Sequence, residues 1–478
     1  MLFNSIGFAI FLPVVFLLYW LVTNKNLRLQ NILLLLASYY FYACWDWRFL
    51  FLLMFSTLLD YCTGLKMQEA ENQKGKRFWF WLSITINLGF LGVFKYYNFF
   101  AQSFAEAISH VGLQVNPWTL QVILPVGISF YTFHGLSYVI DVYKDRIRAE
   151  SNFVDYAVFV SFFPLLVAGP IERATHLLPQ IKKRRTFNYT QAVDGLRQIL
   201  WGLFKKIVIA DNCAEFANQI FNSSADQSGS TLALGAVLFA FQIYGDFSGY
   251  SDIAIGTARL FGIDLLRNFA FPYFSRDVAE FWRRWHISLS SWFKDYLYIP
   301  LGGSKGGNWK RIRNTFIIFI VSGFWHGANW TFIVWGALNA LFIMPSIIMK
   351  TNRNHLETVA QGNILPTVKE FFQMTVTFSL AVLAWIFFRA ENISHAFSYI
   401  SGIFSRSLFS IPTITPRLLM LLIIIFMVIE WLGREQQYAI AKLGLQWKSP
   451  LRYAMYYAII IAIFWFAGKD QQFIYFQF

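Results

Sequence analysis

Long apolar runs recur along the whole chain and limit what it can fold into. Short polar stretches separate them, and many approach the roughly 20 residues that a helix needs to cross a bilayer. Composition agrees, since 56% of the 478 residues are hydrophobic and only 14% are charged, whereas about 25% are charged in soluble domains. The sequence therefore predicts an all-α polytopic membrane protein and argues against a set of soluble domains.

The candidate membrane spans follow one another closely, and not all of them need to cross. They cover residues 5–22, 31–45, 49–65, 78–94, 120–142, 153–168, 191–210, 231–249, 281–300, 312–328, 330–349, 370–389, 415–432 and 451–468. Between two of them lies "AGPIERATHLLPQIKKRR", which contains Gly169-Pro170 and a basic run. We interpret it as a cytoplasmic re-entrant segment, because broken backbone at membrane depth must be buried by protein or water. Residues 281–300 carry too many charges to face lipid.

The basic residues indicate how the chain is oriented in the membrane. Lys and Arg outnumber Asp and Glu by 40 to 26, and they lie in short clusters between the apolar runs. Such clusters favour cytoplasmic loops near anionic lipid over nucleic-acid binding. No Lys or Arg precedes the run 5–22, so we expect a retained helix and no signal peptide. Both termini are then predicted to be extracytoplasmic, with an even number of crossings.

The cysteines do not indicate a cofactor or a covalent framework. Cys44, Cys62 and Cys213 form no CxxC or Cys/His spacing, so we predict no zinc site and no disulfide frame. A P-loop and a GxSxG nucleophile elbow are also absent from the sequence. We expect no bound metal and no bound cofactor.

The central third of the sequence has polar residues within or beside apolar runs, where they are energetically costly in a membrane protein. The run "FAFQIYGDFSGYSDIAIG" contains Asp246, and "FIIFIVSGFWHGANWTFIVWGALNA" contains His326. Between these runs, "FSRDVAEFWRRWHISLSSWFKDYLYIPLGGS" mixes charges and aromatic residues around His286. Ionisable groups in a membrane usually face a protein interior or a watery path. This region is the predicted functional site, with Asp246 in a supporting role.

His326 is the sharpest candidate for catalysis. Glycines 323 and 327 flank it, and we expect them to leave room beside the ring for a substrate. A neutral imidazole, with a pKa of about 6.5, can take a proton from an attacking hydroxyl. Trp325 is a neighbour, and Asn329 or Ser322 could orient the ring or a carbonyl. The alternative role, a hydrogen bond that packs two helices together, stays open on the residues alone.

His286 and the arginines beside it allow two interpretations. His286 could orient a catalytic group or an anionic substrate, although the residues alone favour a structural role. Arg283, Arg284 and the downstream basic residues could bind the phosphates of a nucleotide-bearing acyl donor. Positive-inside charge accounts for at least half of these basic residues.

The two histidine-containing segments resemble those of the membrane-bound O-acyltransferases, in particular the bacterial branch of the alginate O-acetylation membrane protein. "YGDFSGYSDIAIG", "PVGISFYTFHGLSYVIDVY" and the opening "MLFNSIGFAIFLPVVFLLYW" are similar as well, so the resemblance extends nearly end to end. One position departs, since His134 stands where the family more often has glutamine. The resemblance implies a ring of helices around a thin centre with a tunnel, together with re-entrant or interfacial helices.

The resemblance also implies how the chain is organised. We expect one integral-membrane domain over residues 1–478, with a catalytic core at about 120–349 and a C-terminal helix and tail at 451–478. The family's signature histidine corresponds to His326, and its second histidine corresponds to His286.

The activity that the resemblance implies is O-acyl transfer in the bacterial inner membrane. An acetyl group would pass from a cytoplasmic thioester donor, acetyl-CoA, toward an extracytoplasmic SGNH-type acetyltransferase for O-acetylation of a cell-surface polysaccharide. Alginate, another exopolysaccharide and peptidoglycan all remain open as acceptors. Alternatives are D-alanyl transfer from a carrier-protein thioester, a transporter or flippase, and a structural subunit of an export complex. No internal repeat of the kind found in many transporters is visible.

The chain ends on "FIYFQF", Phe473 to Phe478. By composition alone this tail is an interfacial aromatic anchor. It also resembles the tail of a small membrane peptide that accompanies the D-alanylating relative, which implies that Tyr475 carries the acyl group. A thiol has a pKa of about 8.5 and a phenol about 10, so a thioester can acylate a phenol without a large fall in energy.

Overall fold

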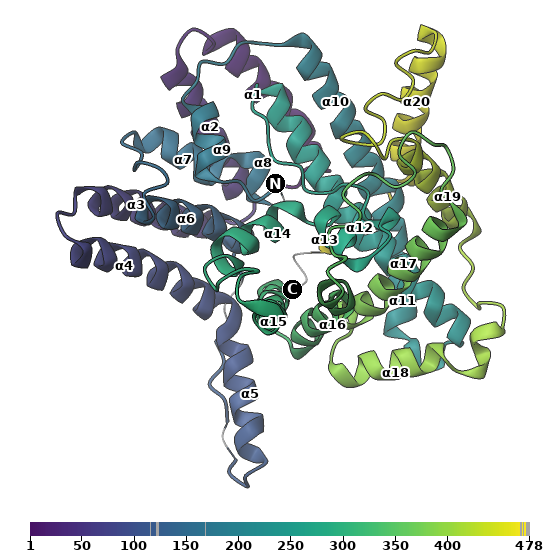
Figure 1. Cartoon of the computed structure of the whole chain (residues 1–478). Coiled ribbons are helices and arrows are strands. Elements are labelled where there is room, and N and C mark those ends of the chain that lie inside the picture. Colours follow the sequence, from purple (N-terminus) through teal and green to yellow (C-terminus); the bar gives the residue numbers. More distant parts are fainter. Residues whose placement is uncertain (115, 121–123, 168, 469–470, 472, 475–478) are drawn as a thin grey trace. The chain divides into compact units, whose positions relative to one another are not determined.

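The computed structural model describes residues 1–478 except 115, 121–123, 168, 469–470, 472 and 475–478. The described residues form helices and contain no strand, which confirms the predicted all-α class (Figure 1). The chain divides into two compact units, residues 1–192 with 257–266 and residues 193–256 with 267–478. The single domain with a core at about 120–349, the ring of helices and the tunnel stay predictions.

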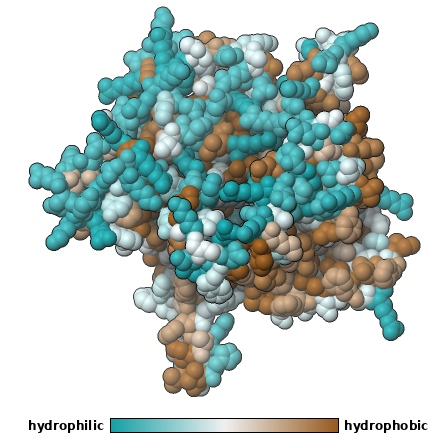
Figure 2. Space-filling view, viewed as in Figure 1, coloured by the Kyte–Doolittle hydropathy of each residue, from teal (hydrophilic) through white to brown (hydrophobic). Residues whose placement is uncertain are grey.

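Within the described residues, six helices are long and apolar enough to cross a membrane. They are α3 (Trp47–Glu69), the continuous helix Gln73–Ser109, α12 (Gly229–Leu260), α16 (Trp330–Ile348), α17 (Val368–Arg389) and α20 (Ser449–Phe466). The helix Ile6–Val22 is apolar but shorter. Large apolar side chains stay exposed on these helices, for example Phe464 and Trp465 of α20. Figure 2 shows such apolar surface beside polar surface on one face, as expected of a protein that contacts lipid.

The first unit is built on α1 (Ile6–Leu17), α2 (Leu27–Ala43), α3, α4 (Gln73–Leu91), α5 (Tyr97–Ser109) and α6 (Ile128–Tyr143). Helices α3, α4 and α6 pack against one another. Asp60 of α3 is buried, and its Oδ1 accepts hydrogen bonds from Ser83 and Asn87 of α4, at 2.6 and 2.7 Å. On α6, Gly135 lets this carboxylate approach, because a Cβ there would lie 2.0 Å from Asp60 Oδ2.

The predicted re-entrant segment, residues 168–185, follows two short helices. These are α7 (Phe153–Ser161) and α8 (Phe163–Leu166), with a break at Phe162, and the segment itself contains α9 (Ala174–Ile181). The Ser38 hydroxyl of α2 accepts a hydrogen bond from the Phe163 amide at 3.0 Å, and the residues at this break, like residues 169–172 before α9, are buried. Non-helical backbone here is therefore covered by protein, as a membrane-embedded segment requires. Its re-entrant path through a bilayer stays a prediction.

The second unit contains the end of α10 (Tyr189–Leu203), the π-helical segment η3 (Phe204–Ala210), α11 (Asp211–Asn222) and α12 as far as Gly256. It continues with α13 (Val278–Arg284), α14 (Ile287–Phe293), the π-helical η6 (Lys294–Tyr298), α15 (Gly307–His326), α16, α17, α18 (Ile393–Ile403), α19 (Arg417–Leu432) and α20. Helix α12 is the most deeply buried of the candidate spans, with 83% of its apolar window inside the protein. Gly249 makes this possible, because a Cβ there would lie 2.8 Å from the Gly202 carbonyl oxygen of α10.

Residues 281–300 do not form one continuous helix. They form the end of α13, then α14 and η6, each too short to cross a membrane. The break falls at His286, whose φ of 44° lies in the left-handed region. The expectation that this charged stretch does not face lipid as a span agrees with its fold.

Candidate active site

His286 lies at a backbone crossing inside the second unit. Its neighbours pair with residues 268–270, since Ala270 N donates to Arg284 O at 2.9 Å and Ile287 N donates to Asn268 O at 2.9 Å. His286 itself is buried and left-handed. A left-handed conformation is uncommon for a residue other than glycine and clusters at functional sites.

Asn268 determines which nitrogen of His286 carries the proton. The Asn268 Oδ1 lies 2.9 Å from His286 Nδ1 and accepts from the Ser288 hydroxyl at 2.9 Å, while its Nδ2 donates to Ser251 at 2.9 Å. With the amide oriented in this way, Nδ1 of the ring donates and Nε2 is left as the acceptor. Burial, together with the nearby His326, lowers the pKa of His286 well below its ordinary value. The ring is therefore neutral at physiological pH, and Nε2 can take a proton.

His326 is the last residue of α15 and is buried among aromatic rings. Its ring centroid lies 5.3 Å from that of Trp335 on α16 and 5.4 Å from that of Phe388 on α17. The expected room at the flanking glycines is not there. A Cβ at Gly323 would lie 2.1 Å from the Phe332 carbonyl oxygen, and one at Gly327 would lie 2.1 Å from the Phe332 ring. These glycines serve the close packing of α15 on α16.

The two histidines border one aromatic cluster. The ring centroid of Trp385 lies 4.9 Å from that of Trp285 and 5.6 Å from that of Trp335, and the Trp335 ring contacts His326. At the end of the cluster near Trp285, the ring centroid of Phe269 lies 5.1 Å from that of Trp285 and 6.4 Å from that of His286. The tertiary fold thus brings the two predicted histidines to one region. Its apolar surroundings strengthen hydrogen bonds and charges that form there.

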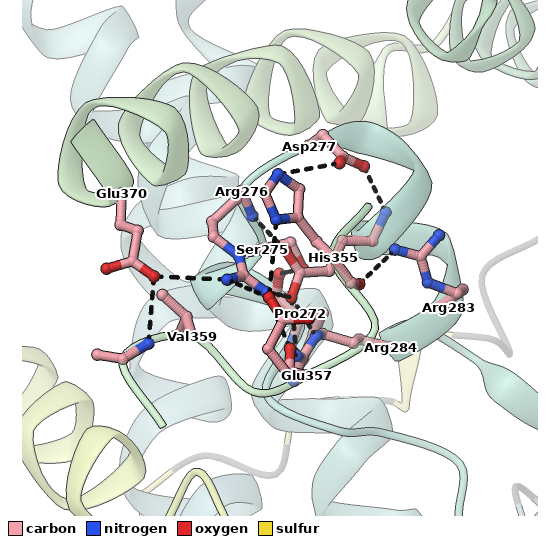
Figure 3. A network of polar contacts seen from close by, with 12 residues as sticks. Pro272, Ser275, Arg276, Asp277, Arg283, Arg284, His355, Glu357, Val359 and Glu370 are labelled. Atoms are coloured by element: carbon pink, nitrogen blue, oxygen red, sulfur yellow. Dashed lines mark hydrogen bonds and ion pairs between the residues drawn. The ribbon is translucent and has the colours of Figure 1, made fainter. Parts of the chain in front are cut away.

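The arginines beside His286 are bonded to the protein itself. Arg283 donates to the carbonyl oxygens of Asn352 and His355 at 2.6 and 2.7 Å, and Arg284 pairs with Glu280 at 2.7 Å. Figure 3 shows Arg283, Arg284 and His355 together with Arg276, which lies 2.9 Å from Glu357. The network attaches the loop after α16 to α13, and it uses much of the hydrogen-bonding capacity of both arginines.

A basic pocket of about 370 Å³ opens beside α13 and α14. Lys294 and Arg353 are exposed, and they line it together with Arg283. The remaining lining residues are Ala279, Trp282, Ile287, Ser290, Ser291, Ile343 and Asn352. One lining residue connects the pocket to His326, because the ring centroid of Trp282 lies 5.7 Å from that of Trp335, which contacts His326. This arrangement suits a phosphate-bearing ligand with a slender reactive end.

Asp246 of α12 lies in a buried ion network. Lys206 of η3 is 2.7 Å from Asp246 and 2.7 Å from Asp211. Asp246 Oδ2 also accepts the backbone amide of Ile474 at 2.7 Å. This predicted supporting residue therefore contacts the C-terminal tail, a partner 228 positions away in the sequence.

The other predicted supporting residues have local contacts. Asn329 caps α16 by accepting the Thr331 amide at 3.0 Å, and its Nδ2 donates to the Glu391 carbonyl at 2.9 Å. Ser322 is buried one turn before His326, and Trp325 is partly exposed. Tyr475 lies outside the described residues. His134, in the first unit, is buried and accepts the Glu172 amide at 3.1 Å, a structural contact.

Sequence reasoning missed Asn268 and the lysines of η3. Lys205 pairs with Asp252 at 2.5 Å beside a polar cavity of about 10 Å³, about the space that one water molecule needs. Glu430 of α19 also lines this cavity. Two consecutive lysines inside the apolar stretch "FKKIVIA" were a readable signal of a buried polar site. Asn268 had no such signal, because an asparagine in a loop is ordinary.

The chain is similar to known acyltransferases over most of its length. The family model for membrane-bound O-acyltransferases matches residues 35–386. A probable alginate O-acetylase, AlgI, of Pseudomonas aeruginosa is 38% identical over 94% of this chain and 84% of its own length. The peptidoglycan O-acetyltransferase of Helicobacter pylori is 38% identical over 84% of this chain and 79% of its own length.

A third relative is more distant. The teichoic acid D-alanyltransferase of Streptococcus thermophilus is 28% identical over 51% of this chain and 62% of its own length. The family match and the two longer similarities agree with the apolar helices. The chain therefore belongs to the membrane-bound O-acyltransferase family, and it is a multi-pass membrane O-acyltransferase.

Proposed function

We propose that this enzyme passes an acetyl group from cytoplasmic acetyl-CoA across the membrane for O-acetylation of a cell-surface polysaccharide. The observation that carries the proposal is the pair of buried histidines, His286 and His326, at one aromatic cluster. The similarity to O-acetylating relatives over most of the chain favours acetyl as the group transferred. D-alanyl transfer is the second candidate, supported only by the shorter similarity. A transporter, flippase or purely structural subunit is not supported, because the family consists of acyltransferases.

The reaction needs a base near the thioester, and the histidines can supply it. The oxygen of an acceptor hydroxyl attacks the acetyl carbonyl carbon while its proton passes to His326. The carbon–sulfur bond then breaks, and the departing thiolate takes the proton from the imidazolium, so that a free thiol and an ester remain. His286, neutral and with Nε2 as acceptor, can hold the acceptor hydroxyl or relay its proton. Exclusion of water by the aromatic cluster protects the thioester from hydrolysis.

The donor is proposed to bind in the basic pocket beside α13 and α14. The phosphates of acetyl-CoA suit Lys294, Arg353 and Arg283 at its rim. The slender thiol arm would extend along Trp282 toward His326. A charged, bulky carrier can then stay outside while the small neutral acetyl group enters the apolar interior.

The first acceptor is proposed to be the hydroxyl of Tyr475 in the C-terminal tail. Two residues of this tail support an internal position over a membrane-surface anchor, since Phe473 and Ile474 are fully buried. The ring centroid of Phe247 lies 6.4 Å from that of Phe473 and 4.5 Å from that of His286. The tail thus enters the interior of the second unit close to the histidines, directly before Tyr475.

The cellular setting is proposed from the chain's charges and its relatives. Lys448 and Arg452 lie at the start of α20, which favours an outward direction for this helix and extracytoplasmic termini. The enzyme would lie in the bacterial inner membrane and pass the acetyl group to an extracytoplasmic SGNH-type acetyltransferase. Alginate, another exopolysaccharide and peptidoglycan are the acceptors to test.

Purified enzyme with radiolabelled acetyl-CoA tests the proposal. We expect acetyl label on the protein, at Tyr475 by peptide mass spectrometry, and no label from D-alanyl carrier-protein thioester. Tyr475→Phe keeps the aromatic ring and should lose the label and the transfer to polysaccharide. Transfer to polysaccharide at the wild-type rate in Tyr475→Phe would overturn the carrier role, and labelling by the D-alanyl donor alone would replace acetyl with D-alanyl.

A further inference from the structure

A buried ion network in the second unit contacts the C-terminal tail directly. Lys206 is 1% exposed, and it lies 2.7 Å from both Asp246 and Asp211. Removing such charges from water is unfavourable, and a protein with apolar residues in their place is often as stable or more stable. A buried network of this kind is weak evidence for stability. Its contacts indicate what else it does.

Both partners of the central ion pair bind the backbone of the tail. Asp246 Oδ2 accepts the amide of Ile474 at 2.7 Å, and Lys206 Nζ donates to the carbonyl oxygen of Gln471 at 3.4 Å. A carboxylate binds an amide donor and an ammonium binds a carbonyl acceptor, so each charge meets the backbone group that suits it. Because main-chain groups are recognised, the contacts set the register of the tail rather than select its side chains.

An aromatic seat lies between these two backbone contacts. Phe473 packs on Tyr250 with ring centroids 4.4 Å apart, and Lys206 lies 5.6 Å from the centre of the same Tyr250 ring. Phe473 also contacts Phe247, which contacts His286. The network, the seat and the histidine site thus form one continuous set of contacts.

The segment that carries Lys206 also holds the helix before the tail. Helix α20 packs against η3, although Ile459 is the one residue of this helix that is buried. Single π-helical turns within α-helices are often found at functional sites. Here the π-helical turn lies where the last helix and the tail both meet the body of the second unit.

We propose that Lys206 and Asp246, supported by Asp211, form a clamp that fixes the register of the C-terminal tail next to the histidine site. In this role they are positioning residues, and the inference rests on the proposed function of Tyr475 as acyl carrier. By holding Ile474, the clamp fixes the chain immediately before Tyr475 in the sequence. The clamp acts on the tail whether or not the tail is acylated.

The experiment measures release of the tail without measuring activity. Purified full-length enzyme in detergent is treated with carboxypeptidase and followed by intact mass. In the wild type, Phe473 and Ile474 should resist removal. In Asp246→Ala, removal should continue past Phe473 at a rate about tenfold higher, because a buried charged hydrogen bond is lost. Asp252→Asn is the matched control, since it weakens a buried ion pair with Lys205, and Asp252 bonds to Lys205 and Gln198 rather than to the tail residues that the structure describes.

Ile474→Pro provides a second test that leaves the network intact. Proline removes the amide hydrogen that Asp246 accepts, so the tail should be released as in Asp246→Ala. Ile474→Val keeps that hydrogen and should keep the protection. In the double variant Asp246→Ala/Ile474→Pro the effects should not add, because both changes break one interaction.

The outcomes separate the clamp from the carrier role. Protection in Asp246→Ala equal to that in Asp252→Asn, or additive effects in the double variant, would overturn the clamp. If Asp246→Ala does not fold, Ile474→Pro against Ile474→Val decides the question alone. Tyr475→Phe tests only the carrier role. Full polysaccharide acetylation in that variant together with a protected tail would reject the carrier and keep the clamp.

Discussion

The two units each bury an aspartate among helices, and the surroundings differ in kind. Asp60 in the first unit is bonded to Ser83 and Asn87 at 2.6 and 2.7 Å, short neutral partners on the next helix, and Gly135 closes over it. Asp246 in the second unit pairs with a buried lysine and binds the chain's own C-terminal tail. Burial of an ionisable group therefore does not by itself mark a functional site. The partners of the buried group decide whether it belongs to a functional site. In a functional site these partners include a histidine, a cavity or a chain end.

The largest expected effect is that of His326→Ala in the second unit. Loss of the general base should lower acyl transfer by about 100- to 10,000-fold, the usual contribution of such a group. The protein should still insert and migrate as the wild type does on size-exclusion chromatography. Transfer from radiolabelled acetyl-CoA is the measurement, and near-normal transfer by a folded variant would remove His326 from the mechanism.

Asn268→Ala should have the next largest effect on activity. Without Asn268 Oδ1, the Nδ1 proton of His286 is no longer held, so the neutral ring can adopt the wrong tautomer. Loss of a group that orients a histidine typically costs about 10- to 100-fold in metal sites, and we expect a similar loss here. The loss should fall on kcat more than on KM and should shift the pH profile. An unchanged pH profile with reduced folding would indicate a structural role only.

Asn87→Ala gives the matching change in the first unit. It removes one of the two partners of Asp60 Oδ1 and leaves that buried carboxylate short of a donor, at a cost of about 1–3 kcal/mol. Thermal unfolding should therefore occur at a lower temperature, while the activity per folded molecule stays at the wild-type level. If Asn87→Ala abolished acyl transfer in folded protein, the distinction between the two buried aspartates would be wrong.

Gly327→Ala tests the packing role of the glycines beside His326. The added Cβ would lie 2.1 Å from the Phe332 ring, so α16 must shift. Overpacking of this kind typically costs about 1–3 kcal/mol, and the melting temperature should fall. Gly89→Ala on α4 is the control, because its Cβ meets nothing within 4 Å. Equal melting temperatures for the two variants would contradict the packing role.

The smallest effect concerns pH and the first unit. A hydrogen bond from His176 Nδ1 to the Glu172 carboxylate, 2.8 Å away, raises the pKa of His176 above its ordinary value. The pair's contribution to stability is therefore full below pH 6.5 and is lost as pH rises through the folded-state pKa. Half-exposed pairs contribute at most about 1 kcal/mol. The melting temperature measured from pH 5.5 to 8.5 should fall slightly more in the wild type than in His176→Gln.

Much of the helical pattern could be predicted from hydropathy. The runs 330–349 and 370–389 correspond to α16 and α17 within two residues at each end, because the hydropathy of a short segment is enough to identify an apolar helix. The charged stretch 281–300 was correctly set apart from the spans. Its break at His286 was not predicted, since a left-handed residue depends on pairing with residues 268–270.

The candidate site was only partly predictable. His286 and His326 stand out because histidines are rare in apolar surroundings, and their residue types suggest proton transfer. The glycines beside His326 were misinterpreted as open space, since sequence alone does not reveal that Phe332 fills it. Asn329 was linked to His326 by proximity in sequence, yet its side chain caps α16.

The sequence by itself determined that this chain is an all-α membrane protein with polar chemistry in its central third. Hydropathy and residue type are properties of short segments, so they can be read without knowing the fold. Only the tertiary structure decided that Asn268 orients His286 and that Lys206 and Asp246 hold the tail. These contacts join residues up to 265 positions apart, and such pairings depend on how the helices pack rather than on any local pattern.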